Sequence, residues 1–475
     1  CSFVCPHATI RQFLLTEEDI KNAPQEFTTI TPMGKGVEEF QYRIQVSPDN
    51  CVGCGLCAVE CPGKGGNKAL EMVDIHEVLP EAPLADYLYK ETEPKLGYYE
   101  TNAVKESQFM TPYFEVSGSC PGCGETPYYR LISQLYGKDM MVANATGCSS
   151  IYCGSTPSTP FIADKNGEGV AWANSLFEDN AEYGYGMALA QTFKEGTILD
   201  IMEKNINDVE PELKEAFQAY IDANDNRDAQ RACKDAIVAG VKASKNDAVK
   251  ELLNYERDLV GKSIWIVGGD GWAYDIGYGG LDHVIANALN VNILVLDTEV
   301  YSNTGGQSSK ASQAASIAKF AAGGKQTAKK DLGQIAMAYG HVYVASIAMG
   351  ANKIQTLKAI KEAEAYQGPS LIIAYSPCIE HGIKGGLMNH QKTQKAAVEC
   401  GYWPLYRFDP RLEKPLQIDF KNPDFDKFQT FIMNETRYSA LLKLTGEEHA
   451  EAAFAKTRSD AEKRFRRLTG LAEFE

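Results

Sequence analysis

Short apolar runs alternate with longer amphipathic stretches over residues 115–410 of the chain. Four runs rich in β-branched residues have the length of single strands, and they cover 264–267, 293–296, 341–345 and 371–374. Helical stretches such as 354–366 separate them, and this alternation is typical of a parallel sheet covered by helices. We therefore predict an α/β fold built on a doubly wound parallel sheet.

A helical segment interrupts this pattern between about residues 195 and 260, where Ala, Glu, Lys and Asp are abundant. Apolar residues recur there at the i, i+3, i+4, i+7 and i+8 positions of one helix face. They are Leu213, Ala216, Phe217, Tyr220 and Ile221. The pattern predicts a helical insertion within the α/β domain.

The first 84 residues differ from the rest, with strand-like pieces at 40–46 and 69–73 between groups of cysteines. A polar stretch containing Pro80, Pro83 and Pro94 follows and favours a linker. We expect a small α+β domain of the bacterial ferredoxin type at 1–84, a linker at 85–115 and the α/β domain at 116–475.

The charge balance argues against a nucleic-acid partner. Net charge is −16, from 47 basic and 63 acidic residues, which disfavours a surface that follows phosphates. The longest apolar runs are far shorter than the roughly 20 residues needed to cross a bilayer, so no membrane span is predicted. The first residues lack the basic start and apolar stretch of a secretory signal, and we expect a cytoplasmic location.

Most of the 13 cysteines stand in tight groups, which indicates metal or cluster binding rather than disulfides. Cys51, Cys54, Cys57 and Cys61, followed by Pro62, form the complete run of a bacterial ferredoxin. A zinc ribbon is the alternative. Four cysteines within 11 residues fit it poorly, because zinc usually takes pairs from separate knuckles.

Cys1 and Cys5, followed by Pro6, repeat the spacing at the end of that run. They are predicted to be the third and fourth cysteines of another copy, so we expect a chain truncated at its N-terminus. In such domains the fourth cysteine of each run binds the other cluster. One 4Fe-4S cluster is then held by Cys5 with the leading cysteines of the second run, Cys51, Cys54 and Cys57. The other keeps Cys1 and Cys61 and lacks two ligands within this sequence.

A third group of cysteines is dispersed along the chain. Cys120 and Cys123 lie in a Gly- and Pro-rich loop, where a thioredoxin-like pair is the alternative, although no strand of that kind precedes them. Cys148 lies in a Gly- and Ser-rich loop, and Cys378 follows a predicted buried strand, where α/β domains place ligands. Cys153 competes with Cys148, so the residues alone leave the fourfold set open.

A glycine turn ends the strand predicted at 264–267. Asp270 lies in this turn between Gly269 and Gly271, and a helix-like stretch at 281–289 follows. Backbone amides in such a turn can approach a diphosphate, while the carboxylate supplies a hard oxygen for Mg²⁺. A polar loop containing Asn303 follows about 30 residues later, a spacing typical of thiamine diphosphate sites. A dinucleotide-binding fold is the alternative, but its G-x-G-x-x-G is absent from the sequence.

Together these motifs resemble the pyruvate:ferredoxin (or flavodoxin) oxidoreductase family. The similarity covers nearly the whole chain and rests on the Cys-Pro-His start, the cysteine run at 51–62, Ser-Gly-Ser-Cys-Pro-Gly-Cys-Gly-Glu-Thr-Pro-Tyr at 117–128, and Tyr-Ser-Asn-Thr-Gly-Gly-Gln-Ser-Ser-Lys at 301–310. The last two segments are the most specific.

The resemblance implies particular roles for individual residues. It implies that the cluster nearest the thiamine is held by Cys120, Cys123, Cys148 and Cys378. It implies that Mg²⁺ is held by Asp270, Thr298 and the carbonyl of Val300, and that Asn303 lies beside the substrate carbon as the catalytic candidate. The implied thiamine diphosphate contacts are Glu125, Cys148, Gly269, Asp270, Gly271, Trp272, Thr298, Glu299, Val300, Tyr301, Ser302 and Asn303.

The resemblance also implies an activity. It is the oxidative decarboxylation of pyruvate with coenzyme A, with electrons passing through three 4Fe-4S clusters to ferredoxin or flavodoxin, in a homodimer. Upstream domains of the same enzyme are expected to complete the active site, so this piece alone is expected to be inactive. The alternatives are an oxidoreductase for 2-oxoglutarate or branched-chain 2-oxo acids, a non-oxidative decarboxylase or carboligase, and an electron-carrier module without catalysis.

Overall fold

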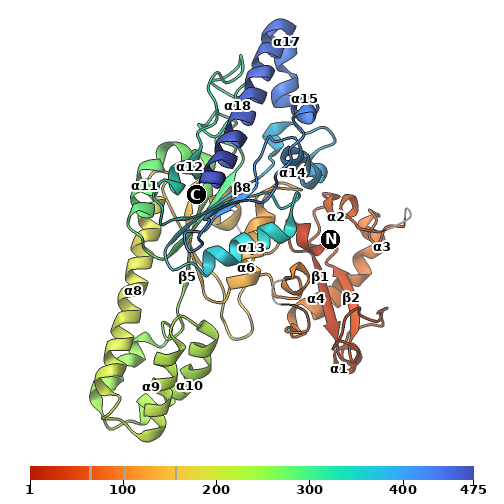
Figure 1. Ribbon diagram of the computed structural model, residues 1–475. Helices are drawn as coiled ribbons and strands as arrows, with labels where there is room; N and C mark the ends of the chain where they lie inside the picture. Colours follow the sequence, from red (N-terminus) through yellow and green to blue (C-terminus); the bar gives the residue numbers. More distant parts are fainter. Residues whose placement is uncertain (64–66, 101–102, 156–157, 475) are drawn as a thin grey trace.

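A mostly parallel sheet forms the centre of the structure (Figure 1). The computed structural model describes residues 1–63, 67–100, 103–155 and 158–474, and within them this sheet has eight strands in the order β10-β9-β7-β8-β6-β5-β3-β4. The strands from β3 to β8 run parallel, whereas β9 is antiparallel to β7 and β10 is antiparallel to β9. Their bounds are β3 Met140–Ala145, β4 Ala171–Ser175, β5 Ser263–Gly269, β6 Val291–Asp297, β7 Tyr343–Ile347, β8 Pro369–Tyr375, β9 Tyr406–Phe408 and β10 Leu416–Ile418. The α/β prediction and its four strands are confirmed.

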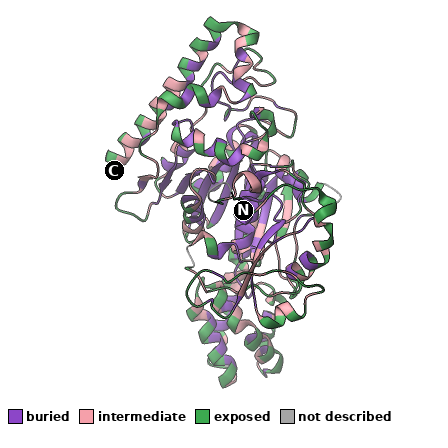
Figure 2. Cartoon of the chain, turned by 90° about the vertical axis from the view of Figure 1, so that its right-hand side faces the viewer, coloured by how far each residue is buried: buried purple, intermediate pink, exposed green. Residues whose placement is uncertain are grey.

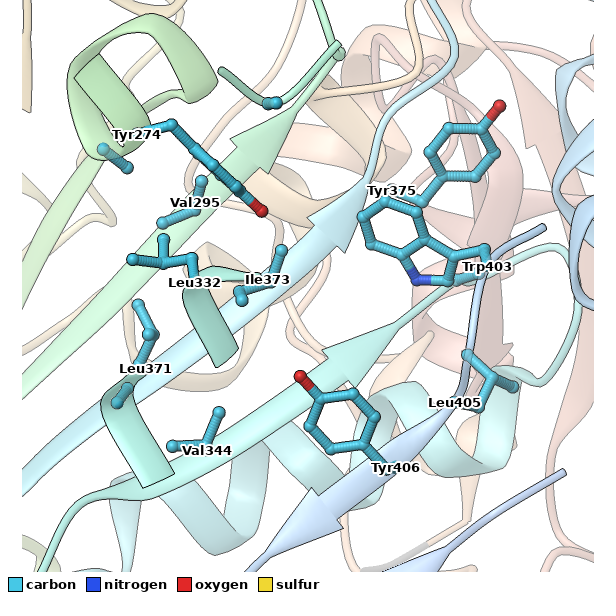
Figure 3. Packing of buried hydrophobic residues seen from close by; sticks show 14 of the residues in the cluster. Tyr274, Val295, Leu332, Val344, Leu371, Ile373, Tyr375, Trp403, Leu405 and Tyr406 are labelled. Carbon is cyan, nitrogen blue, oxygen red and sulfur yellow. The ribbon is translucent and has the colours of Figure 1, made fainter. Parts of the chain in front are cut away.

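Helices cover both faces of this sheet, which explains why its strands are apolar without alternation. Trp265 and Val267 of β5 pack with α6 and α13 on one face. Ile264 and Ile266 of the same strand pack with α8 and α11 on the other. Figure 3 shows the second face near Leu332, and Figure 2 shows the sheet as the most buried part of the chain. The helices concerned are α6 Thr126–Tyr136, α8 Asn180–Asn205, α11 Tyr278–Ala286, α12 Leu332–Met337 and α13 Lys353–Glu364.

The helices after α13 form a C-terminal extension above the sheet in Figure 1. Phe454 and Leu468 of the long helix α18 are buried in the same core as the sheet face that carries α11. The bounds are α14 His390–Glu399, α15 Phe428–Ile432, α16 Thr436–Ser439, α17 Leu441–Thr445 and α18 Glu447–Phe474. Among the described residues, no helix is both long enough and apolar enough to span a bilayer.

The predicted helical insertion extends below the sheet in Figure 1 and has its own apolar core. It comprises α8, α9 Pro211–Ala223, α10 Arg227–Ala243 and the 3-10 segment η4 Asp247–Tyr255. Leu213, Phe217 and Tyr220 are buried in that core, as the helix pattern predicts. Helix α8 begins at Asn180, before the predicted 195, and its first half contains Gly184 and Gly186, which have low helix propensity. The core of the insertion takes residues of α8 only from Ile198 onward.

Gly184 is the residue that lets α8 approach the sheet, and it provides a stability test. A Cβ atom there would lie 2.4 Å from Ile266 Cγ1 and 3.0 Å from Ala143 Cβ. We expect Gly184→Ala to lower the free energy of unfolding by about 1–3 kcal/mol through overpacking. Gly196→Ala, in the same helix with no neighbour within 4 Å, is the control and is expected to raise it by up to about 1 kcal/mol. Urea denaturation of both variants measures the difference, and equal effects would contradict this account.

The described part of the N-terminal region contains the antiparallel pair of β1 Ile10–Leu15 and β2 Gln41–Val46 with four short α-helices. The strand predicted at 40–46 is confirmed as β2. The strand predicted at 69–73 is wrong: these residues form no strand, and Met72 and Val73 are 53% and 49% exposed. Strand preference depends on a surface against which such side chains can pack, and no described part of the chain covers these two. The helices are α1 Glu17–Lys21, α2 Leu56–Val59, α3 Ile75–Val78 and α4 Ala82–Lys90.

The range predicted as a linker, 85–115, is partly helical. Leu84, Ala85 and Leu88 of α4 are buried, and α4 is followed by α5 Val104–Ser107. Pro80 and Pro83 stand in the first turns of two helical segments, where proline is favoured. These two prolines mark helix starts, whereas Pro94 lies between α4 and α5 in neither helix nor strand, and the limits of the domains stay a prediction.

Candidate cofactor sites

The first site lies where β5 and β6 end at the same edge of the sheet. Gly269 of β5 is paired with Leu296 of β6, so the residues that follow each strand emerge side by side. Parallel α/β sheets bind ligands at this carboxyl edge. The strand register therefore brings Asp270 and Thr298 together although they are 28 positions apart.

Three oxygen atoms converge at this edge. Thr298 Oγ1 lies 2.9 Å from Asp270 Oδ1 and 2.9 Å from the carbonyl oxygen of Val300, and all three residues are buried. The Ser309 hydroxyl donates to the other carboxylate oxygen of Asp270 at 2.6 Å. Burial, followed by the charge of Asp297, raises the pKa of Asp270 to about 8. A bound cation would act in the opposite direction, because it favours the carboxylate. Hard oxygens in this arrangement suit Mg²⁺.

A cleft of about 270 Å³ opens beside these oxygens. Ten of the twelve residues implied as thiamine diphosphate contacts line it: Glu125, Cys148, Gly269, Asp270, Gly271, Thr298, Val300, Tyr301, Ser302 and Asn303. The side chains of Trp272 and Glu299 do not. Trp272 is buried in the core, and Glu299 is held by Lys329 and Arg437 behind the loop.

The cleft has features that suit a bound diphosphate cofactor. A Cβ on Gly271 would lie 2.5 Å from Tyr301, and nothing lies nearer than 3.9 Å to a Cβ built on Gly269, so the backbone of the turn can be approached closely. Glu125 is 4% exposed, and its Oε2 has no hydrogen-bond partner. Burial raises the pKa of Glu125 to about 7. A buried polar atom without a partner is unusual in a folded protein and is explained here if a ligand completes the site.

The second site is a cavity of about 160 Å³ that adjoins the cleft. The four cysteines Cys120, Cys123, Cys148 and Cys378 all line it, while Cys153 is buried in the core on the sheet face that carries α6. The two cavities share Glu125, Cys148, Thr298, Ser302 and Asn303. Cys148 Sγ lies 3.2 Å from Ser302 Oγ, which joins the cysteine cavity directly to the polar loop.

The chemistry of these thiols favours an iron–sulfur cluster. Burial, followed by the charge of Glu125, raises the pKa of Cys148, and neighbouring cysteines raise it further. Burial also raises the pKa of Cys378. Four thiolates gathered in a buried cavity repel one another, and ligation to iron offsets that cost. In the described part of the chain, no three His, Cys, Asp or Glu side chains are placed to hold a single ion. In a 4Fe-4S cluster each thiolate binds a different iron atom. Four cysteines can therefore hold a cluster without converging on one point.

The cysteines of the N-terminal region are also close together. Burial, followed by the charges of Cys5, Cys54 and Cys51, raises the pKa of the Cys57 thiol to about 11. Cys5 thus lies close enough to the second run for their charges to interact, and the cross-over assignment of the ligands stays a prediction.

A buried ionic network behind the polar loop was not predicted. Lys329 Nζ lies 2.6 Å from Asp297 Oδ2 and 3.3 Å from Glu299 Oε1, and Arg437 lies 2.9 Å from Glu299 Oε2. Burial would raise the pKa of Glu299, but Lys329 and Arg437 outweigh it and lower that pKa to about 2. Lys329 lies in a polar loop without periodicity, so no local signal marks it as buried.

Removing Lys329 provides a second stability test. We expect Lys329→Met to lower the free energy of unfolding by about 3–5 kcal/mol, because Asp297 and Glu299 would stay buried without this cation. Lys204→Met removes an exposed pair with Asp200 and is expected to change it by less than about 1 kcal/mol. Chemical denaturation measures the free energy of unfolding of both variants. A decrease for Lys329→Met as small as that of the control would contradict this expectation.

His381 connects the two cofactor sites. Its Nε2 lies 2.7 Å from the carbonyl oxygen of Thr298, and the backbone N–H of Cys378 donates to its Nδ1 at 3.4 Å. Burial, followed by Arg437, lowers the pKa of His381 to about 3, so the ring is neutral and can donate at one nitrogen while it accepts at the other. The sequence marked this histidine only as a neighbour of Cys378.

Comparisons with known proteins agree with the cleft at the ends of β5 and β6 and with the N-terminal cysteine run. The model of the thiamine pyrophosphate enzyme C-terminal TPP-binding domain matches residues 238–374, and the model of the 4Fe-4S binding domain matches 44–64. The chain is 50% identical over its full length to the pyruvate:ferredoxin oxidoreductase of Moorella thermoacetica. It is 49% identical over 99% of its length to the pyruvate-flavodoxin oxidoreductase of Klebsiella pneumoniae. The chain is homologous to one part of the pyruvate:ferredoxin and pyruvate:flavodoxin oxidoreductases.

This homology covers a portion of the longer proteins. The chain spans 41% of the Moorella enzyme and 40% of the Klebsiella enzyme. It is also 44% identical over 93% of its length to the mitochondrial pyruvate dehydrogenase [NADP(+)] of Euglena gracilis, of which it spans 25%. The predicted family resemblance is confirmed, as are thiamine diphosphate and 4Fe-4S cofactors. Magnesium, the number of clusters and the individual ligands stay predictions.

Proposed function

We propose that the chain is the cofactor-binding and electron-transfer part of an enzyme that converts pyruvate and coenzyme A to acetyl-CoA and CO₂. The observation that carries the proposal is the contact between the two cavities. The cleft beside Asp270 and the cavity of four cysteines share Cys148, Ser302 and Asn303, so a carbon centre in the cleft would lie next to an electron acceptor. The names of the relatives support pyruvate as the substrate.

The chain's own residues have the following roles in this proposal. Asp270, Thr298 and the carbonyl of Val300 hold Mg²⁺, and the turn at Gly269 and Gly271 lies against the diphosphate. Asn303 lines both cavities and positions the 2-oxo acid. When bound, thiamine diphosphate supplies the nucleophilic carbon, and the clusters accept electrons one at a time.

The assembly of the enzyme belongs to the same proposal. We infer a doubly wound sheet at 116–475 and a two-cluster ferredoxin-like domain at 1–84, which gives three 4Fe-4S clusters in series leading to ferredoxin or flavodoxin. Upstream domains contribute the coenzyme A site and two ligands of the cluster held by Cys1 and Cys61, and the enzyme is a homodimer. Non-oxidative decarboxylation would leave the cysteine cavity without a role, and a simple electron carrier would leave the cleft without one.

Anaerobic purification of the complete gene product tests the proposal. Iron, sulfide and thiamine diphosphate are measured per chain, and reduction of ferredoxin or flavodoxin is followed with pyruvate and coenzyme A. We expect the iron content of three 4Fe-4S clusters per chain. We also expect that reduction of the carrier requires both pyruvate and coenzyme A. A protein that contains no iron would refute the proposal, and so would one that releases CO₂ without reducing either carrier. If the electron carrier is reduced faster with 2-oxoglutarate than with pyruvate, the substrate of the enzyme is a different 2-oxo acid.

A further inference from the structure

A short 3-10 turn, η7 Leu387–Asn389, lies between the cysteine cavity and the ferredoxin-like region. It follows a glycine-rich stretch in which Gly382, Gly385 and Gly386 have positive φ, and it leads into α14. The turn contacts helix α2 of the N-terminal region. It therefore touches two segments that carry different sets of cysteines.

On one side the turn is fastened to the loop of Cys120 and Cys123. Gly122 lies between these cysteines with φ of +81°, and a Cβ there would lie 2.9 Å from Leu387 Cβ. Leu387 itself lines the cavity of the four cysteines. His390, buried directly after the turn, lies with Nδ1 2.6 Å from the carbonyl oxygen of Gly122. A carbonyl only accepts, so Nδ1 carries the proton and holds the loop against the turn.

On the other side the turn touches the loop of Cys54 and Cys57. A Cβ on Gly55 would lie 3.2 Å from Met388 Cε and 3.8 Å from Met388 Cβ. Cys54 and Cys57 belong to the set with Cys5 and Cys51, whose charges act on one another. Two consecutive side chains, Leu387 and Met388, thus contact the two cysteine loops in turn.

We propose that Leu387 and Met388 form the route by which electrons leave the cluster of Cys120, Cys123, Cys148 and Cys378 for the cluster of Cys5, Cys51, Cys54 and Cys57. This inference rests on the proposed function. In the step one electron leaves the first cluster, which is oxidised, and reduces the second, and no bond or proton is transferred. Electron transfer slows steeply as the gap widens, and the contacts of Leu387 at Gly122 and of the 38% exposed Met388 at Gly55 hold the two loops at a constant distance. Leu387 and Met388 are positioning residues, since they touch neither substrate nor thiamine.

The test uses the complete anaerobic enzyme with the double variant Leu387→Ala/Met388→Ala. The control is Leu412→Ala/Met72→Ala, which truncates the same two residue types at partly exposed positions elsewhere. Rapid-freeze electron paramagnetic resonance after mixing with pyruvate follows each cluster separately. We expect the first cluster to be reduced as fast as in the unaltered enzyme, the fast phase of reduction of the second to be lost, and the reduced first cluster to accumulate. If the second cluster is reduced at the same rate in the variant, the control and the unaltered enzyme, the proposal is overturned.

A second readout separates this proposal from the proposed function. With both clusters reduced by dithionite, without pyruvate, their magnetic coupling reports how they are held relative to each other. We expect weaker coupling in the alanine variant, with iron per chain unchanged, and recovery in Leu387→Ile/Met388→Leu. If coupling and iron match the unaltered enzyme while onward transfer is also unchanged, the route is wrong although the proposed function stands. If pyruvate reduces no cluster in the unaltered enzyme while dithionite shows the expected change, the proposed function fails and the placement of η7 stands.

Discussion

Replacing Asp270 with asparagine is expected to weaken the joint binding of thiamine diphosphate and Mg²⁺ by more than about 100-fold. Loss of a residue that only supports a metal ligand costs about 10–100-fold in affinity, and Asp270 is predicted to be a ligand itself. Its carboxylate also organises the site, because it accepts hydrogen bonds from Thr298 and from Ser309 at 2.6 Å. The amide keeps the size of the side chain but not its charge.

Titration calorimetry of the cofactor-free enzyme with thiamine diphosphate and Mg²⁺ measures this effect. Asp247→Asn is the matched control, since Asp247 is an exposed carboxylate in the helical insertion that pairs with Lys250. The absorbance of the iron–sulfur clusters should be the same in all three proteins, which shows that Asp270→Asn remains folded. Binding within threefold of the unaltered enzyme would exclude Asp270 as a metal ligand.

Replacing Cys378 with serine is expected to remove one whole cluster and to abolish reduction of the electron carrier by pyruvate. Cys378 lines the cavity with Cys120, Cys123 and Cys148, and it lies on a different loop from each of them. Because the cluster is assembled from these dispersed loops, its binding free energy also stabilises their arrangement. Thiamine diphosphate binding should weaken less than cluster binding, since Cys378 does not line the cleft.

Iron and sulfide per chain, with the resonance signals of the individual clusters, measure this loss. The control is Cys233→Ser, which changes a partly buried cysteine in the helical insertion and should leave both quantities unchanged. We expect the signals of the N-terminal clusters to persist in Cys378→Ser, because their cysteines come from another region. A variant with full iron content and unchanged signals would remove Cys378 from the ligand set and reopen the case for Cys153.

The two sites depend on each other through few residues. His381 accepts from the backbone of Cys378 and donates to the carbonyl of Thr298, and Ser302 lies against Cys148. A cluster bound in the cavity would therefore fix the loop that holds the metal, and a bound metal would fix the loop that faces the cluster.

Much of this protein is determined by local sequence. The apolar runs at 264–267 and 293–296 define buried parallel strands because strands covered on both faces need no polar alternation. The glycine turn around Asp270 lies within one loop, and so do Cys51, Cys54 and Cys57. Each of these two motifs can therefore be recognised from a single segment of the sequence. Leu213, Phe217 and Tyr220 predict their helix for the same reason, since the helix repeat spans neighbouring turns.

Other features depend on tertiary contacts between segments that are far apart in the sequence. The place of Cys148 beside Ser302 depends on a contact across 154 positions, and no local pattern separates Cys148 from Cys153. Lys329, His381 and Leu387 likewise make their contacts with residues that are far away in the sequence. The 69–73 segment resembled a strand, yet the described residues leave Met72 and Val73 about half exposed. Strand and helix preferences act over a few residues, whereas burial, ion pairing and the gathering of ligands depend on which strands become neighbours in the sheet.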